Sequence, residues 1–410
     1  MTFAPPALHH PWLALVAMLA VQVLASLVMS SAAVLSPAVA PQLGIPAERL
    51  GWFVALAYLF AMLSGLGCGR WVARLGGVRV SQWALVLLGA GAALATAGTG
   101  PALMAAAVLI GAGYGLANPS AAAVLGRHAP THASGLFFSI KQAGVPMGVA
   151  LAGLMLPATL LLVGWRASLL LALAMCLACA LLLFGTVGRL QGNSASPQAM
   201  VAGTGTGWMA PLAGVLRDPL LRRLGLLSLV YAMTQQCFVT FLVSLLHFQV
   251  GLSLASAAGV LAASQVASTF ARIGLGHASD RWMPPLRLLA WLGVLMACCM
   301  VALAAAGHFA LEALALVAAL ACAATAMGWN GVFFSALVRA VPAPRLAEVS
   351  GATQFLTFTG GMLGPFAASQ MVALGGSYAM AMLTVAVFPA VSGWMALRAG
   401  PARAADQGFR

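Results

Sequence analysis

Charged residues are scarce in this chain. They make up 6% of its 410 residues, whereas apolar residues make up 62%. Soluble proteins contain about 25% charged residues, so a soluble protein of this length could not cover its surface with so few. Intrinsic disorder is excluded as well, because disordered chains are poor in apolar residues. The composition therefore predicts an integral membrane protein.

Acidic residues are the rarest of the charged ones, with six against 19 Lys and Arg, which gives a formal net charge of +13. The arginines lie between apolar runs and form no aromatic-interleaved basic patch, so we expect no nucleic-acid partner. A nucleophile–base pair, a phosphate-binding loop and a metal-ligand set are also missing. We therefore expect no cofactor, no metal site and no enzymatic activity, and we interpret the cysteines as packing residues.

Twelve apolar runs are long enough to cross a bilayer, which takes about 20 residues for a helix. The alternating pattern of a membrane β-barrel is missing. The sequence therefore predicts an all-α membrane protein with twelve transmembrane helices. The runs cover residues 12–37, 48–69, 79–98, 101–126, 133–160, 165–187, 219–248, 254–277, 285–306, 309–337, 346–373 and 376–398.

One connection is much longer than the others. Residues 188–217 include the segments 192–197 and 203–207, which are rich in Gly, Ser and Thr, as flexible linkers are. We expect a six-helix bundle at 1–187, a cytoplasmic linker loop at 188–217 and a second six-helix bundle at 218–410.

The arginines between the runs are distributed unequally. Fifteen fall on one side of the predicted membrane, and Arg49 and Arg166 fall on the other. Cytoplasmic loops are the ones enriched in positive charge. This distribution predicts that both termini are cytoplasmic and that the protein lies in a bacterial-type inner (plasma) membrane.

The two halves repeat each other at three places, in the same order along the chain. The offset grows slowly, from 207 through 212 to 216, as small loop insertions would cause. The matching pairs are residues 69–74 with 276–281, Asn118 with Asn330, and 134–148 with 350–364. Parallel repeats of this kind place a substrate site near the midplane between the halves.

With these features, the chain resembles transporters of the major facilitator superfamily over all twelve runs. That family carries a G-x-x-x-D-R-x-G-R-type loop between spans 2 and 3 and a second copy between spans 8 and 9. The positions kept here are Gly69, Arg74 and Gly76 in the first copy and Gly276, Asp280 and Arg281 in the second.

The resemblance implies two pseudo-symmetric six-helix bundles that work by alternating access and function as a monomer. In the family, the two loops latch the halves together on the cytoplasmic side, so the six kept residues are predicted to act in gating. The first copy has Ala73 where the family has aspartate. Asp280 is therefore expected to carry the larger share of the latch.

Lys141 is the only lysine of the chain. It lies about eight residues into the fifth run, which corresponds to roughly 12 Å of helix. A charge at such depth is costly and usually functional, although a lysine can also extend its ammonium group to the interface. Together with the neighbouring Gln142, Lys141 is predicted to bind substrate.

Arg272 lies in the eighth run, four residues before Gly276. It matches the arginine that binds the substrate carboxylate in monocarboxylate transporters and oxalate/formate exchangers of this superfamily. Those exchangers also carry a lysine in span 11, where this chain has Thr357, and the repeat makes Lys141 its equivalent in span 5. The resemblance implies that Arg272 binds a carboxylate; snorkelling or pairing with Asp280 are the alternatives.

Uncharged polar side chains complete the predicted substrate site. Spans 1, 4, 7 and 10 line the central cavity in this family, but each side chain could equally make an interhelical hydrogen bond. The candidates are Gln22, Asn118, Tyr231, Gln235 and Asn330, with Gln354 from span 11.

We therefore expect a secondary active transporter for a small organic anion, a mono- or dicarboxylate. No acidic residue lies near the centre of a run, which argues against cationic substrates. The predicted site residues are compatible with proton symport, in which Lys141 would release and rebind the proton, and with anion exchange. The alternatives are an efflux transporter of the same fold for drugs or neutral compounds, and a membrane sensor that binds an anion without moving it.

Overall fold

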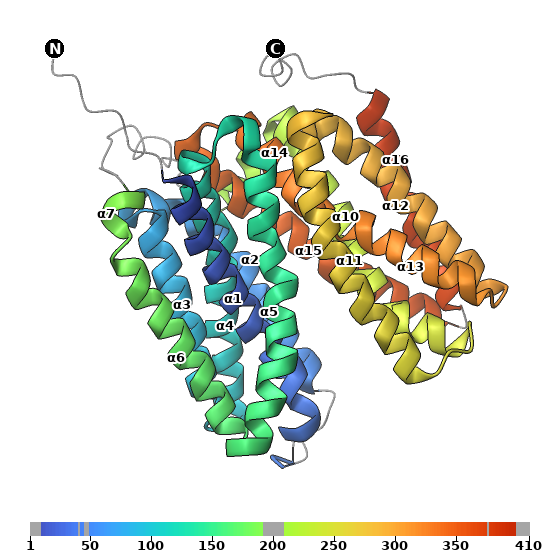
Figure 1. Ribbon diagram of the computed structural model, residues 1–410, viewed down its shortest axis with the longest axis horizontal. Helices are drawn as coiled ribbons and strands as arrows, with labels where there is room; N and C mark the ends of the chain where they lie inside the picture. Colours follow the sequence, from blue (N-terminus) through green and yellow to red (C-terminus); the bar gives the residue numbers. More distant parts are fainter. Residues whose placement is uncertain (1–9, 40–41, 45–48, 192–208, 375–376, 399–410) are drawn as a thin grey trace. The chain divides into compact units, whose positions relative to one another are not determined.

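The computed structural model describes residues 10–39, 42–44, 49–191, 209–374 and 377–398, and these are almost entirely helical. The predicted Gly-rich linker segments, together with Glu48, Arg403, Asp406 and Arg410, lie outside the described residues. The chain forms two compact units (Figure 1). The first unit comprises Met1–Thr131, Lys141–Ala213 and Val341–Ala352, and the second comprises His132–Ile140, Gly214–Ala340 and Thr353–Arg410.

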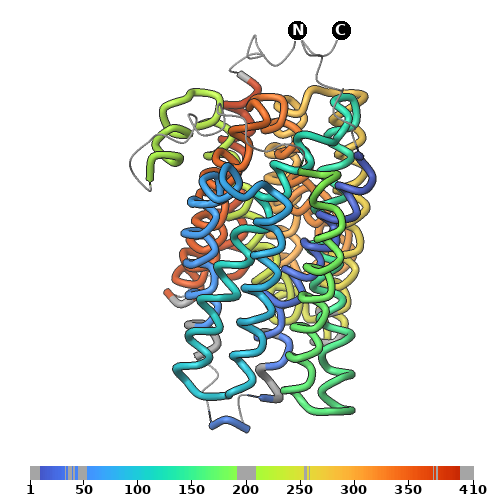
Figure 2. Tube along the Cα trace, turned by 90° about the vertical axis from the view of Figure 1, so that its left-hand side faces the viewer, coloured from blue at the N-terminus to red at the C-terminus, as the bar shows by residue number. Residues whose placement is uncertain are grey.

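Six long helices and a short one form the first half of the chain. They are α1 (Pro11–Val39), α2 (Arg49–Leu75), α3 (Gly77–Ala95), α4 (Gly100–His128), α5 (Ser134–Val163), α6 (Trp165–Phe184) and α7 (Val187–Leu190). In the first unit α4 packs on α1, α2 and α3, and α3 also packs on α6; Figure 2 shows these helices running alongside one another. Pro146 and Pro157 lie inside α5, as membrane helices tolerate.

The second half repeats this arrangement, with one helix in two pieces. The helices are α9 (Ala210–Arg217), α10 (Pro219–Phe248), α11 (Leu254–Arg281), α12 (Pro285–His308), α13 (Glu312–Ala326), α14 (Trp329–Ala340), α15 (Leu346–Ala373) and α16 (Tyr378–Arg398). In the second unit α12 packs on α13 and α16, and α11 packs on α13 and α14. Asp218 caps α10 by accepting from the backbone amides of Leu220 and Leu221, which satisfies free first-turn donors.

The long helices correspond to the twelve predicted spans, with α13 and α14 together forming one span, whereas the short helices α7 and α9 lie at the ends of the predicted linker. Ten of the twelve are long and apolar enough to cross a membrane, with α13 and α14 counted as one candidate. The other two, α11 and α15, have 28 residues each. The all-α prediction with two repeated six-helix halves is therefore confirmed. One detail differs, because the tenth span is interrupted at Met327 and Gly328, directly before Trp329.

Glycine contacts confirm the internal repeat. A Cβ added to Gly148 of α5 would lie 2.2 Å from the carbonyl oxygen of Val23 in α1. A Cβ added to Gly364 of α15 would lie 2.8 Å from the carbonyl oxygen of Met233 in α10. Equivalent glycines thus bring equivalent helix pairs into backbone contact, as small residues do between membrane helices.

Two hydrogen bonds within the first unit show which helix ends lie on the same side. The Arg127 guanidinium donates to the carbonyl oxygen of Gln191 at 3.2 Å, so the end of α4 meets the end of α7. At the opposite end, Arg166 Nε donates to the carbonyl oxygen of Thr96 at 3.0 Å. The helices therefore run up and down in turn, as the division of the arginines predicts.

Candidate functional site

Lys141 lies at the centre of a polar cluster formed by α1, α4 and α5. Its ammonium group donates to Gln22 Oε1 at 2.6 Å, to Gln142 Oε1 at 3.1 Å and to Asn118 Oδ1. Gln22 in turn donates to Ser26 Oγ at 3.3 Å. Four predicted substrate-binding residues thus come together around one ammonium group, and Gln22 is 119 positions from Lys141 in sequence.

The Lys141 cluster is buried and holds its cation with neutral groups. Lys141 is 2% exposed, and Gln22 and Gln142 are also buried. An ammonium group has three donors, and the three amide oxygens accept them. The four described acidic residues all lie at helix termini: Asp218, Asp280, Glu312 and Glu348. When Lys141 is protonated, the cluster carries a net positive charge in a medium where charge is costly, which suits an anionic ligand.

A second polar cluster lies in the second unit, beside the break between α13 and α14. Gln235 Oε1 accepts from Trp329 Nε1 at 3.1 Å and from Asn330 Nδ2 at 3.3 Å. Asn330 also donates to the carbonyl oxygen of Met327, at 3.4 Å. Interrupted helices provide such unpaired carbonyl groups at the binding sites of transporters.

Tyr231 stands edge-on to Trp329, with their ring centroids 5.7 Å apart. Its hydroxyl group donates to the carbonyl oxygen of Leu289 in α12 at 2.6 Å, and the side chain is fully buried. The hydroxyl group therefore ties α10 to α12.

Arg272 and Gln354, the remaining predicted substrate-binding residues, are buried in the second unit on α11 and α15. Arg272 is 2% exposed and Gln354 is 5% exposed. Arg272 stands about one helical turn before Gly276 and about two turns before Asp280. A buried guanidinium group in a membrane helix is a strong candidate for an anion ligand.

The second loop copy forms a junction between α11 and the start of α5. Asp280 accepts from the backbone amides of Gly135 at 2.9 Å and Leu136 at 2.8 Å, and it pairs with Arg339 of α14 at 2.9 Å. The Asp280 side chain is 3% exposed. A carboxylate at the free amides of a helix N-terminus is favourable because it meets the positive end of the helix dipole. Asp280 thus joins three helices.

The first loop copy forms the equivalent junction between α2 and the start of α15. A Cβ added to Gly69 would lie 2.7 Å from the Cα of Glu348, so the two helices touch through their backbones. Glu348 lies in the first turn of α15, and the positive charges of Arg345 and Arg70 act on it. At this junction the carboxylate, Glu348, belongs to α15, whereas Ala73 stands at the position of the first loop copy where the family has aspartate.

The other predicted gating residues lie around these junctions. Arg74 and Arg281 are exposed. Gly76 has φ of +82° in the turn between α2 and α3, a conformation that favours glycine. Gly276 faces Ser139 of α5, whose Oγ would lie 2.2 Å from a Cβ at that position.

Sequence reasoning missed two residues of the junctions, Arg339 and Glu348. The signal for Glu348 was present, since an acidic residue in the first turn of a helix compensates the helix dipole. Its nearness to Gly69 depends on the tertiary fold. As for other kinds of site, within the described ranges no group of three or more His, Cys, Asp or Glu residues could hold a metal ion.

Two repeated six-helix halves, each with a buried polar cluster, are the architecture of a secondary transporter. The sequence profile of the Major Facilitator Superfamily matches residues 18–365. The chain belongs to this superfamily. It is a multi-pass membrane transporter.

Solved structures agree on the fold. FucP, the E. coli fucose:proton symporter, was solved in an outward conformation and is 16% identical in sequence to this chain. The superposition has a TM-score of 0.75 and covers 95% of this chain and 99% of FucP. A bacterial homologue of the iron transporter ferroportin is 14% identical with a TM-score of 0.75, and the match covers 94% of this chain and 99% of the homologue. The human organic anion transporter MFSD10 is 15% identical with a TM-score of 0.71, and the match covers 94% of this chain and 100% of MFSD10. A search of curated proteins gives no match.

Proposed function

We propose that the chain is a secondary active transporter for a small organic anion that carries a carboxylate group. The observation that carries this proposal is the Lys141 cluster, in which a buried ammonium group is held by three amide oxygens. A substrate carboxylate that replaces one amide oxygen would neutralise the charge and make a charge-assisted hydrogen bond. The amides would then orient the ammonium group toward the substrate.

Arg272 is the second cation of the proposal. Its planar guanidinium group can bind a carboxylate through two parallel hydrogen bonds, whereas Lys141 acts as a point charge. Arginine stays protonated in proteins, so Lys141 is the group that would exchange a proton if transport is proton-coupled. Anion exchange would need no such step, because the incoming anion replaces the outgoing one.

The proposed setting is a bacterial-type inner membrane, with both termini in the cytoplasm. The arginine-rich ends of the helices support this orientation through the positive-inside rule. The loop copies at Gly69 and Gly276 lie at those ends and would form the cytoplasmic gate. Asp280 is the stronger of the two latches in this proposal, because it bonds to α5 and α14.

The test is counterflow of labelled short carboxylates in vesicles that contain the purified protein. We expect wild-type flux to fall about 10-fold to 100-fold in Lys141→Gln, because a hydrogen bond to a charged group contributes about 1.5–3 kcal/mol. Arg189→Gln is the matched control, since it removes an exposed positive charge from α7. Flux equal in Lys141→Gln and wild type would contradict the proposal.

The second candidate is a transporter for neutral compounds, favoured by the uncharged cluster of Gln235, Trp329 and Asn330. It predicts flux of neutral compounds that Lys141→Gln preserves and Gln235→Ala reduces. Saturable carboxylate binding without flux would instead indicate a membrane sensor. The same vesicles distinguish all three functions when binding and flux are measured side by side.

A further inference from the structure

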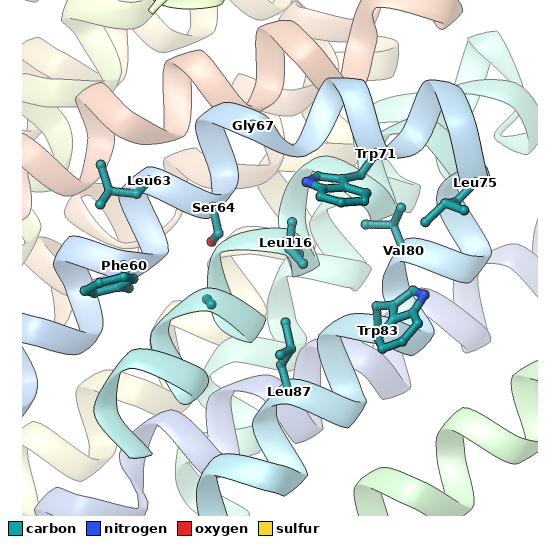
Figure 3. Close-up of a pocket in the computed structure, with 11 residues that line it drawn as sticks. Phe60, Leu63, Ser64, Gly67, Trp71, Leu75, Val80, Trp83, Leu87 and Leu116 are labelled. Atoms are coloured by element: carbon teal, nitrogen blue, oxygen red, sulfur yellow. The ribbon is translucent and has the colours of Figure 1, made fainter. Parts of the chain in front are cut away.

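A cavity of about 560 Å³ opens on the surface of the first unit between α2, α3 and α4. Its lining is almost entirely apolar, as Figure 3 shows with Phe60 and Leu63 at one end and Trp71 and Leu75 at the other. Its one hydroxyl group, on Ser64, donates to the carbonyl oxygen of Ala61 in its own helix at 3.3 Å. The volume is within the range of ligand pockets, about 300–1,000 Å³, but the lining offers little to a polar substrate.

The cavity is long and follows one face of α2. Its lining residues on α2 run from Phe60 to Leu75 at intervals of one helical turn, which corresponds to about 22 Å of helix. Trp71 and Trp83 flank the cavity and are 53% and 56% exposed. Tryptophan is enriched where membrane proteins meet the headgroup region. The shape therefore fits an alkyl chain that runs from the membrane interface toward the bilayer centre.

Three arginines are next in sequence to residues that line one end of the cavity. Arg70, Arg74 and Arg79 are exposed, and each directly precedes a lining residue, respectively Trp71, Leu75 and Val80. Arg74 and Arg79 flank the turn between α2 and α3, and neither has a carboxylate partner among the described residues. Arg70 is partly compensated, because Glu348 lies beside Gly69. Arg74 and Arg79 are thus the main cations at this end.

We propose that this cavity is a binding site for an anionic phospholipid. One acyl chain occupies the apolar groove between α2, α3 and α4, and the phosphate pairs with Arg74 and Arg79. Guanidinium groups bind phosphate through paired hydrogen bonds, and basic residues next to a membrane attract anionic lipids. The phosphate supplies, from the lipid, the negative charge that the first loop lacks at Ala73. This site is separate from the Lys141 cluster and does not depend on the proposed substrate.

The test measures lipid retention by native mass spectrometry of the full chain after exposure to mixed micelles of phosphatidylethanolamine and phosphatidylglycerol at 3:1. We expect the wild type to retain phosphatidylglycerol at least five-fold above its share in the mixture. Arg74→Gln with Arg79→Gln should bring retention back to that share. Ala112→Phe, which fills the groove from α4, should abolish tight retention of both lipids.

Two controls match these variants. Ala105→Phe adds the same ring to an exposed position of α4 outside the groove, and Arg217→Gln with Arg287→Gln removes two exposed arginines of the second half. Both should behave as the wild type. Retention of the two lipids in their input ratio by the wild type, or unchanged retention in Ala112→Phe, would overturn the proposal. A preference that survives in Arg74→Gln with Arg79→Gln would overturn the assignment of the phosphate.

A second measurement covers the case in which Ala112→Phe fails to fold. Phosphatidylglycerol brominated in its acyl chain quenches tryptophan fluorescence on contact. We expect quenching that saturates at a low fraction of this lipid in the wild type. The saturating component should be lost in Trp71→Phe with Trp83→Phe, and its persistence there would contradict the site.

Discussion

Two junctions in this molecule each bring the end of one helix into backbone contact with the first turns of another. At the first, the end of α2 meets the start of α15, and a Cβ at Gly351 would lie 1.9 Å from the carbonyl oxygen of Gly65. At the second, the end of α11 meets the start of α5, and a Cβ at Gly135 would lie 2.7 Å from the carbonyl oxygen of Gly276. Equivalent glycines allow both approaches, because the halves are repeats.

The chemistry of the two junctions differs. Asp280 at the second junction belongs to α11 and bonds to the backbone of α5, so it connects different helices. At the first junction Ala73 replaces that carboxylate, and Glu348 stands in the first turn of α15 itself. A carboxylate in the first turn of its own helix is stabilised by the helix dipole, and Glu348 also interacts with α2 through the charge of Arg70. The comparison indicates that the second junction depends on direct polar bonds, whereas the first depends on close packing and on this charge interaction.

Removal of Asp280 should have the largest effect. Asp280→Ala removes the carboxylate that accepts from Arg339 and from two first-turn amides of α5, and breaking a buried pair costs about 3–5 kcal/mol. We expect the free energy of unfolding to fall by about 3 kcal/mol, the lower end of this range, because the Arg339 side chain is 23% exposed and water can solvate it. The thermal unfolding midpoint in detergent measures it. Asp218→Ala is the control, since loss of a helix cap costs about 1 kcal/mol; an equal loss in both variants would contradict the prediction.

Filling the glycine contacts should have the next largest effect, and a similar one at both junctions. Gly135→Ala and Gly351→Ala each place a methyl group against backbone and should cost about 1–3 kcal/mol, as overpacking does. Gly153→Ala on α5 is the control, because nothing lies within 4 Å of the added methyl group. Unfolding midpoints of the three variants check this. A loss confined to one junction would break the structural equivalence of the two.

Neutralising Glu348 should have a smaller effect than removing Asp280. Glu348→Gln removes a first-turn charge from α15, which should cost about 0.3–1 kcal/mol. Glu312→Gln makes the same change in the first turn of α13, where the side chain is exposed. The two unfolding midpoints should shift alike. A shift as large as that of Asp280→Ala would mean that Glu348 also connects helices.

Restoring the missing carboxylate should have the smallest effect and one that depends on Glu348. Ala73→Asp should change stability by less than about 0.5 kcal/mol in the wild type, because a second carboxylate near Glu348 is opposed by like charge. In Glu348→Gln the same substitution should be stabilising. A double-mutant cycle on unfolding midpoints measures the coupling, and equal effects in both backgrounds would show that the two positions do not interact.

The fold followed closely from local sequence. The predicted run 219–248 coincides with α10, since Asp218 and Pro219 mark its start and the apolar run defines its length. The interruption at Gly328 was missed because the apolar pattern continues across it. It depends on packing, since a Cβ at Gly328 would lie 2.7 Å from the Leu275 side chain on α11.

The candidate site followed from sequence only as separate residues. Lys141 stood out as the one lysine, and Gln22, Asn118 and Gln142 as polar groups in apolar runs. Their convergence on one ammonium group required the packed helices. The same holds for Arg339 at Asp280 and for Glu348 at Gly69, because these partners lie far apart along the chain.

The sequence by itself determined that this protein spans a membrane, where its helices lie, that it is built from two repeats, and which helix ends collect the arginines. Those properties are local, because the bilayer acts on each segment according to its own hydropathy and flanking charge. Only the tertiary structure decided which polar groups surround Lys141, which carboxylate serves each junction, and that α2, α3 and α4 leave an apolar groove beside Arg74 and Arg79. Such features depend on distances between distant segments, which no pattern along a single chain contains.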